Sequence, residues 1–108
     1  MLFTAGSETT RKAIAGGLME LVKRPDQLAW LREDAASRLP SAVEEILRGT
    51  TPSVYKRRTV TRDVELCGQA LRAGDKLTVW EMSANRDETV FGDPFHFDST
   101  WHGIRTPT

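Results

Sequence analysis

Two groups of residues combine reactive side chains with helical spacing. The first is the run Ala5-Gly6-Ser7-Glu8-Thr9-Thr10, in which a carboxylate stands beside a hydroxyl. Such a pair can relay a proton, and a threonine hydroxyl can also bond back to the carbonyl four residues earlier. Gly6 leaves room for a planar group against the same turn. The alternative is a capped, frayed helix start, where Ser, Thr and Glu are common.

The second group is Glu45 and Arg48, which are three residues apart and therefore share a helix face. They can form an ion pair. The alternative is an exposed surface pair worth a few tenths of a kcal/mol. Neither group contains a metal-ligand cluster, so no metal site is predicted.

Three helical patterns position these residues. Apolar residues at i, i+4, i+7 and i+8 predict helices over residues 2–23 and 39–48. Between them, Leu28 and Leu31 favour a short helix over residues 25–33, which Pro25 would begin. Gly16-Gly17 is typical of a site where another backbone or a flat ligand comes close. The apolar stripes are Ile14, Leu18, Leu21 and Val22 in the first helix and Leu39, Val43, Ile46 and Leu47 in the third.

The ends of the third helix have two interpretations. Ser41 and Glu44 fit a capping box, and Ser37 as the cap with Pro40 in the first turn fits as well. Gly49 is expected to stop this helix.

The chain changes character after Pro52. Residues 54–60, 64–66 and 76–82 predict two or three short antiparallel strands, with turns at Gly68-Gln69 and at residues 73–75. Residues 83–97 are expected to form an irregular loop. The fold class is therefore mainly α with a small antiparallel β-hairpin region. Three aromatic residues are expected to anchor the loop: Phe91, Phe95 and Phe97.

Composition excludes several classes of protein. A chain of 108 residues suits one small domain with a modest core, and 15 basic and 15 acidic residues argue against a nucleic-acid binder. No apolar run is long enough to span a membrane and no export signal is present, so a cytoplasmic protein is expected. Cys67 alone forms neither an internal disulfide nor a multi-cysteine zinc site.

The order of the motifs resembles the C-terminal half of the cytochrome P450 family, the haem-thiolate monooxygenases. The helix with A-G-x-E-T-T comes first and the helix with E-x-x-R second, followed by Arg57-Arg58-Thr59, a hairpin, and A-N-R-D…F-x-D-P-x-x-F-D. The resemblance covers residues 1–98. Residues 52–59 are similar to those of actinobacterial members that oxidise sterols and branched lipids.

The resemblance implies a role for each matched position in the first helix. Residues 2–23 would cross the distal face of the haem, with Ala5 and Gly6 lining the oxygen pocket. Glu8 and Thr9 would be the acid–alcohol pair that delivers protons to dioxygen.

The later motifs match family positions with structural and haem-binding roles. Glu45 and Arg48 would form a buried ion pair that His96 completes; the alternative for His96 is a partly exposed loop histidine. Arg58 would pair with a haem propionate, because a guanidinium donates two parallel hydrogen bonds to a carboxylate; the alternative is a solvated strand arginine. Family members take electrons from a ferredoxin-type donor and oxidise a small hydrophobic substrate.

The sequence departs from the family at the iron ligand. The family ligand loop, F-x-x-G-x-x-x-C-x-G, follows the Phe-Asp loop, whereas Cys67 precedes Phe97 by 30 residues and is interpreted as a hairpin residue. Trp101 stands where the family has Arg, and nothing after it matches. We therefore expect a partial P450-like domain at 1–98 and a non-matching tail at 99–108, a possible frameshift product. Met1 falls inside the expected distal helix.

These departures lead to three hypotheses of function. The first is a monooxygenase fragment, inactive alone because it has no axial cysteine for the haem. The others are one part of a split enzyme, assembled with a separately encoded ligand loop, and a small non-catalytic binding module.

Overall fold

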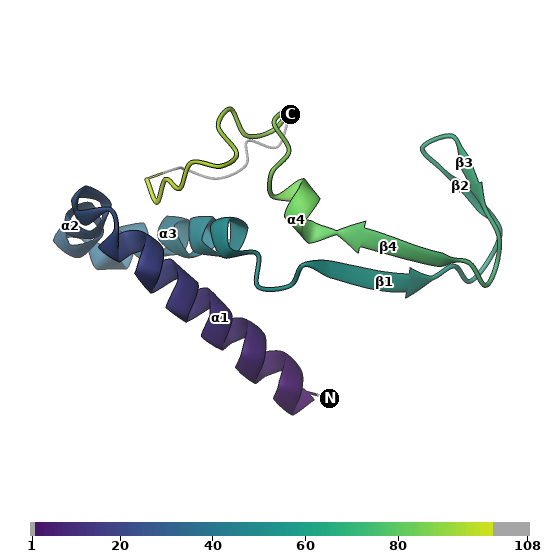
Figure 1. Cartoon of the computed structure of the whole chain (residues 1–108), viewed down its shortest axis with the longest axis horizontal. Coiled ribbons are helices and arrows are strands. Elements are labelled where there is room, and N and C mark those ends of the chain that lie inside the picture. Colours follow the sequence, from purple (N-terminus) through teal and green to yellow (C-terminus); the bar gives the residue numbers. More distant parts are fainter. Residues whose placement is uncertain (1, 101–108) are drawn as a thin grey trace.

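Three helices form the first half of the chain, as expected (Figure 1): α1 at Leu2–Val22, α2 at Pro25–Glu33 and α3 at Ala35–Thr50. The computed structural model describes residues 2–100, with side chains from residue 5 onward. Most of the expected tail, including Trp101, lies outside the described residues.

Helix α3 is longer than its apolar pattern predicts. Its N-cap is Asp34, whose side chain accepts a hydrogen bond from the Ser37 amide at 3.2 Å. Both expected caps are therefore wrong, and Pro40 lies inside the helix. The helix passes Gly49 and ends where Thr51 adopts a left-handed conformation, with φ 39°.

The apolar stripes of α1 and α3 are not the faces that pack inward. Three of the four stripe residues in each helix are between 41% and 66% exposed. In α1 only Leu21 of the stripe is buried, together with Ala13 and Gly17, and in α3 the buried residues are Ala42, Glu45 and Arg48. The core that this arrangement leaves is small: Leu21, Leu31, Ala42 and Phe97, with Leu28, Trp30 and Ile46 packed against it.

The glycine pair explains this choice of face. A Cβ at Gly16 would stand 2.6 Å from Thr50 Cγ2, and one at Gly17 would stand 2.6 Å from Ile46 Cγ2. The two glycines therefore allow α1 to approach side chains of α3 more closely than any larger residue would. The sequence predicts another backbone or a flat ligand beside Gly16-Gly17; the neighbours are instead two side chains of α3.

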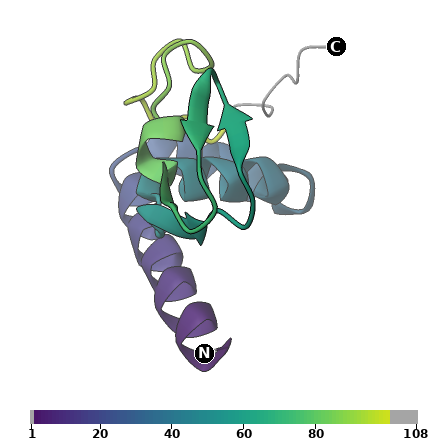
Figure 2. The ribbon, with the colours of Figure 1, turned by 90° about the vertical axis from the view of Figure 1, so that its right-hand side faces the viewer.

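Four strands follow in two antiparallel pairs. β1 (Tyr55–Thr59) pairs with β4 (Lys76–Trp80), and β2 (Val64–Leu66) pairs with β3 (Gln69–Leu71). The β2–β3 hairpin lies at the far end of the β1–β4 ladder, away from the helices (Figures 1 and 2). Its two-residue turn is Cys67-Gly68, with φ 51° and 77°, as a type I′ turn requires. Gln69, expected in the turn, belongs to β3.

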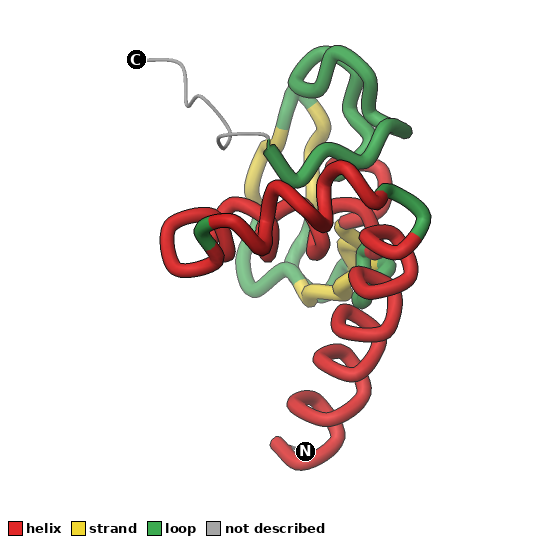
Figure 3. The backbone as a smooth tube through the Cα atoms, turned by 90° about the vertical axis from the view of Figure 1, so that its left-hand side faces the viewer, coloured by secondary structure: helices red, strands yellow, loops and turns green. Residues whose placement is uncertain are grey.

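A short helix and a long loop return the chain to α3. Residues 81–82 were expected in a strand but begin α4 (Glu81–Ala84), and the loop from residue 85 to 100 runs alongside α3 (Figures 1 and 3). Phe97 anchors this loop, at 4% exposure. The anchor expected at Phe95 is wrong: its side chain is 80% exposed and its ring faces the Arg86 guanidinium.

The described chain is extended. Its radius of gyration is 17.1 Å and its extents are 52 × 37 × 22 Å; a compact domain of this length would have a radius of gyration of about 13 Å. Within the described residues, no helix has the length and apolar character to cross a membrane.

Candidate functional site

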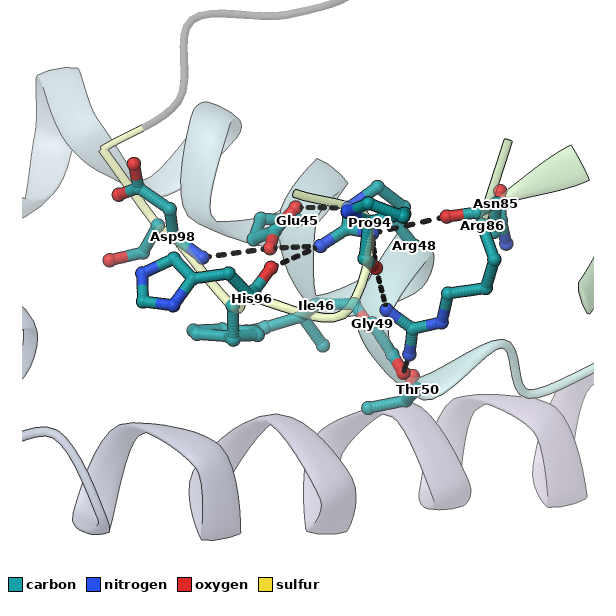
Figure 4. A network of polar contacts seen from close by, with 12 residues as sticks. Glu45, Ile46, Arg48, Gly49, Thr50, Asn85, Arg86, Pro94, His96 and Asp98 are labelled. Atoms are coloured by element: carbon teal, nitrogen blue, oxygen red, sulfur yellow. Dashed lines mark hydrogen bonds and ion pairs between the residues drawn. The ribbon is translucent and has the colours of Figure 1, made fainter. Parts of the chain in front are cut away.

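The centre of the polar site is a bidentate ion pair within α3 (Figure 4). Arg48 Nε donates to Glu45 Oε2 at 2.6 Å, and Arg48 Nη2 donates to Glu45 Oε1 at 2.7 Å. The side chains are 8% and 2% exposed. The hydrogen bonds from the guanidinium to Glu45 raise the pKa of Arg48, so the guanidinium stays charged.

Arg48 also holds the loop that packs on α3. Its Nη2 donates to the carbonyl of His96 at 2.7 Å, and its Nη1 donates to the carbonyls of Pro94 at 2.7 Å and Asn85 at 3.1 Å. All five guanidinium N–H groups are thus engaged. His96 contributes its backbone oxygen to this site, and any residue type can supply that contact.

A second arginine, Arg86, reinforces the same loop. Its Nη2 donates to the carbonyl of Gly49 at 2.7 Å, near the end of α3, and its Nη1 donates to the carbonyl of Pro94 (Figure 4). Burial lowers the pKa of Arg86, and repulsion from Arg48 lowers it further. The two carbonyls that accept its hydrogen bonds, those of Gly49 and Pro94, partly offset this repulsion.

A third polar group joins α2 to the end of the loop. Gln27 Nε2 donates to the carbonyl of Phe97 at 3.0 Å, and Gln27 Oε1 accepts from both the amide and the hydroxyl of Ser99 at 2.9 Å. Ser41 Oγ donates to the Ser99 carbonyl at 3.1 Å. Gln27 is 8% exposed and Ser99 is fully buried.

The residues of the proposed acid–alcohol pair lie on the first turns of α1. Thr9 Oγ1 donates to the Ala5 carbonyl at 2.7 Å, the back-bond expected of a helical threonine. Glu8 forms ion pairs with Arg11 at 2.5 Å and Lys12 at 3.6 Å. A Cβ at Gly6 would meet nothing within 4 Å, so the space beside this turn is open.

The remaining candidates lie on the strands. Arg58 is exposed in β1, opposite Leu77, and its Nη1 donates to the carbonyl of Arg57 at 3.1 Å. Cys67 is an exposed free thiol in the turn between β2 and β3. It is a hairpin residue, as expected.

A groove of about 570 Å³ adjoins the Arg48 side chain, between the end of α3 and α4. Leu47, Pro52, Ala84 and Phe91 line its apolar part. Arg48 lies over the Phe91 ring at 5.0 Å, so the groove and the ion-pair site share a wall.

Two important residues in this site were given no role from the sequence. Arg86 stands in the quoted A-N-R-D motif, and its bonds to backbone carbonyls leave no trace in sequence spacing. Gln27 had one usable signal: it lies four residues before Leu31, so a polar side chain shares a helix face with a buried leucine.

Comparison with known proteins matches almost the whole described chain. The family model for cytochrome P450 matches residues 1–100. Cytochrome P450 126 of Mycobacterium tuberculosis is 56% identical over 100 residues, which are 93% of this chain and 24% of that protein. A methyl-branched lipid omega-hydroxylase of Mycobacterium bovis is 49% identical over 98 residues, 91% of this chain and 23% of that protein.

A solved structure agrees with these relatives. The cytochrome P450 CYP268A2 of Mycobacterium marinum, in complex with pseudoionone, is 43% identical and superimposes with a TM-score of 0.81. The match covers 95% of this chain and 24% of that one. The chain spans about a quarter of the length of the curated relatives it matches. It belongs to the cytochrome P450 family.

Proposed function

We propose that this chain is the part of a P450 monooxygenase that runs from the distal helix to the loop before the cysteine-ligand loop. The complete enzyme would insert one oxygen atom of O2 into a small hydrophobic substrate, such as a sterol or a branched lipid. The observation that carries the proposal is the match to the P450 family along residues 1–100.

Helix α1 would form the distal wall of the reaction site. Ala5 and Gly6 would line the oxygen pocket, and the open space beside Gly6 leaves room for a flat ring system. Thr9 donates its own proton to the Ala5 carbonyl, so its hydroxyl oxygen is left to accept a hydrogen bond. Glu8 would relay a proton that it takes from solvent, because its side chain is 44% exposed and its ion pairs with Arg11 and Lys12 lie at the surface, where such pairs are weak.

The residues present fit part of a haem site. When bound, the haem supplies the iron chemistry that activates dioxygen. The exposed Arg58 guanidinium has the charge and planar donor geometry to pair with a propionate. Cys67 does not fit the axial position, because it lies in an exposed turn between two strands. This chain would therefore contribute the distal face and a propionate partner and would leave the thiolate to another segment.

The remaining parts of the proposal follow from the family. A ferredoxin-type protein would donate electrons to the complete enzyme. The P450-like segment would run to residue 100, where the family match ends, and the sequence after it would arise by frameshift. Downstream DNA that encodes Pro-Asn-Pro-His and a glycine-rich cysteine loop in another frame would support the frameshift. A neighbouring reading frame that carries this loop would support a split enzyme.

Two measurements test the proposal. The chain is mixed with haem and its reduced carbon-monoxide spectrum is recorded; we expect no band typical of thiolate-ligated haem. In parallel, residues 1–98 replace the matching segment of cytochrome P450 126, and we expect the chimera to show that band. A thiolate band from the chain alone, or a folded chimera that binds no haem, would contradict the proposal.

The same chimera tests the role of Thr9. Thr9→Val removes the hydroxyl and keeps the shape of the side chain, so we expect an unchanged carbon-monoxide spectrum and less product per electron consumed. Thr10→Val is the matched control and should leave that ratio unchanged. Equal product ratios in all three proteins would contradict the assignment of Thr9.

A further inference from the structure

Side chains of two helices hold the main chain of the loop before Thr100. Arg48 holds the carbonyls of Pro94 and His96, and the amide of Asp98 donates to Glu45 Oε1 at 2.8 Å. The Glu45–Arg48 pair therefore orders the loop as far as Asp98. Among the described residues, no hydrogen bond joins this pair to Ser99 or Thr100.

Gln27 and Ser41 continue this support by one further residue. Gln27 bonds to the carbonyl of Phe97 and to the amide and hydroxyl of Ser99, and Ser41 bonds to the carbonyl of Ser99. Ser99 is thus held at both its amide and its carbonyl, by residues of two different helices. Hydrogen bonds at both groups fix the position and the direction of the main chain at Ser99.

Because Gln27 is buried, its side chain depends on the loop for hydrogen bonds. An amide side chain removed from water is destabilising unless its polar atoms are bonded, and at 8% exposure Gln27 has few alternatives to the loop. Its Oε1 accepts two hydrogen bonds, and its Nε2 donates one. A shift of the loop by one residue would break all three bonds.

We propose that Gln27 is a positioning residue that, with Ser41, fixes the position of the main chain at Ser99 against α2 and α3. This inference rests on the proposed function in one respect: in the P450 family the segment after this loop carries the cysteine ligand. Gln27 would then act on the haem site indirectly, by setting the starting point of the ligand segment.

Residue-resolved amide hydrogen exchange on the full chain tests the proposal. In the unsubstituted chain the Ser99 amide should be protected. Gln27→Met keeps the length of the side chain and removes its three hydrogen bonds, so Ser99 protection should fall roughly tenfold or more, while that of the Ile46 amide inside α3 stays the same. Gln69→Met makes the same chemical change at an exposed strand position and should alter neither amide.

Two further variants separate positioning from general packing. Gln27→Glu keeps an acceptor for Ser99 and should restore most of the lost protection. Ser41→Ala removes the bond to the Ser99 carbonyl and should lower protection at Ser99 without changing it at Ile46. An unprotected Ser99 amide in the unsubstituted chain, or parallel loss at Ser99 and Ile46 in both Gln27→Met and Ser41→Ala, would overturn the proposal. No haem is present in these experiments, so their failure would not bear on the monooxygenase proposal.

Discussion

The guanidinium of Arg48 holds both carboxylate oxygens of Glu45, at 2.6 and 2.7 Å, on the buried face of α3. The same guanidinium reaches three carbonyls of the chain between residues 85 and 96. One side chain therefore connects α3 with the loop that follows the strands. The balance of charge within this pair should decide whether the loop stays in place.

Removing the carboxylate should destabilise the chain strongly. Glu45→Ala leaves Arg48 buried without its counter-charge and removes the acceptor of the Asp98 amide. We expect the free energy of unfolding to fall by about 3–5 kcal/mol, enough to unfold a small chain. Urea unfolding followed by circular dichroism measures this change.

A neighbouring glutamate provides the control for this experiment. Glu44 is exposed on the same helix, and Glu44→Ala should change the free energy of unfolding by less than about 0.5 kcal/mol. Equal stabilities for the two variants would show that the buried pair contributes nothing.

Two glycines of α1 should respond to alanine in opposite directions. Gly17→Ala places a Cβ 2.6 Å from Ile46 Cγ2, and this overpacking should destabilise the chain by about 1–3 kcal/mol even though alanine favours helix. Gly6 faces open space, so Gly6→Ala should stabilise the isolated chain by up to about 1 kcal/mol. Thermal unfolding of both variants tests the pair; a stabilising Gly17→Ala would contradict the close packing of α1 on α3.

Sequence pattern predicted the type of each long element better than its buried face. Helical spacing predicted the bounds of α1 and α2 closely, because in both helices the apolar pattern begins and ends where the helix does. It failed for the packing of α3, whose buried residues include Glu45 and Arg48 while Leu39 and Val43 remain exposed. Periodicity assumes that the apolar face packs inward, and here a bonded ion pair and small residues occupy that face.

The polar site was only partly predictable for a related reason. Glu45 and Arg48 are three residues apart, so their contact follows from helix geometry. Apart from Glu45 and the Ser99 hydroxyl, the partners of Arg48, Arg86 and Gln27 are backbone groups of the loop or, at Gly49, of α3. Backbone carbonyls are present at every residue, so no residue type marks which of them is bonded.

Acid should weaken the end of α1 through Glu20. The hydrogen bond from Arg24 lowers the pKa of Glu20 most, and the hydrogen bond from Lys23 lowers it further. A depressed carboxyl pKa adds stability above the unfolded value of about 4.5, and this stability is lost as the pH falls through the folded pKa. Glu20→Gln should therefore lower the free energy of unfolding at pH 7 by less than about 1 kcal/mol, because both partners are partly exposed.

Urea unfolding at pH 3, 5 and 7 tests the sign of this effect. The difference between Glu20→Gln and the unsubstituted chain should shrink as the pH falls below 5. It should also shrink in 1 M NaCl, which screens partly exposed ion pairs. A difference that grows in acid would contradict the assigned direction of the pKa shift.

Cys67 should influence the turn that contains it and have no part in binding iron. Its φ of 51° is a conformation that asparagine adopts more readily than cysteine, so Cys67→Asn should stabilise the chain by up to about 1 kcal/mol. Cys67→Val should destabilise it, because a branched side chain is strained at positive φ. Thermal unfolding measures both effects, and a haem titration followed by absorption should give the same spectra for the Asn variant and the unsubstituted chain. A thiolate-type band that disappears in Cys67→Asn would instead make this turn residue an iron ligand, because asparagine preserves the turn and removes only the sulfur.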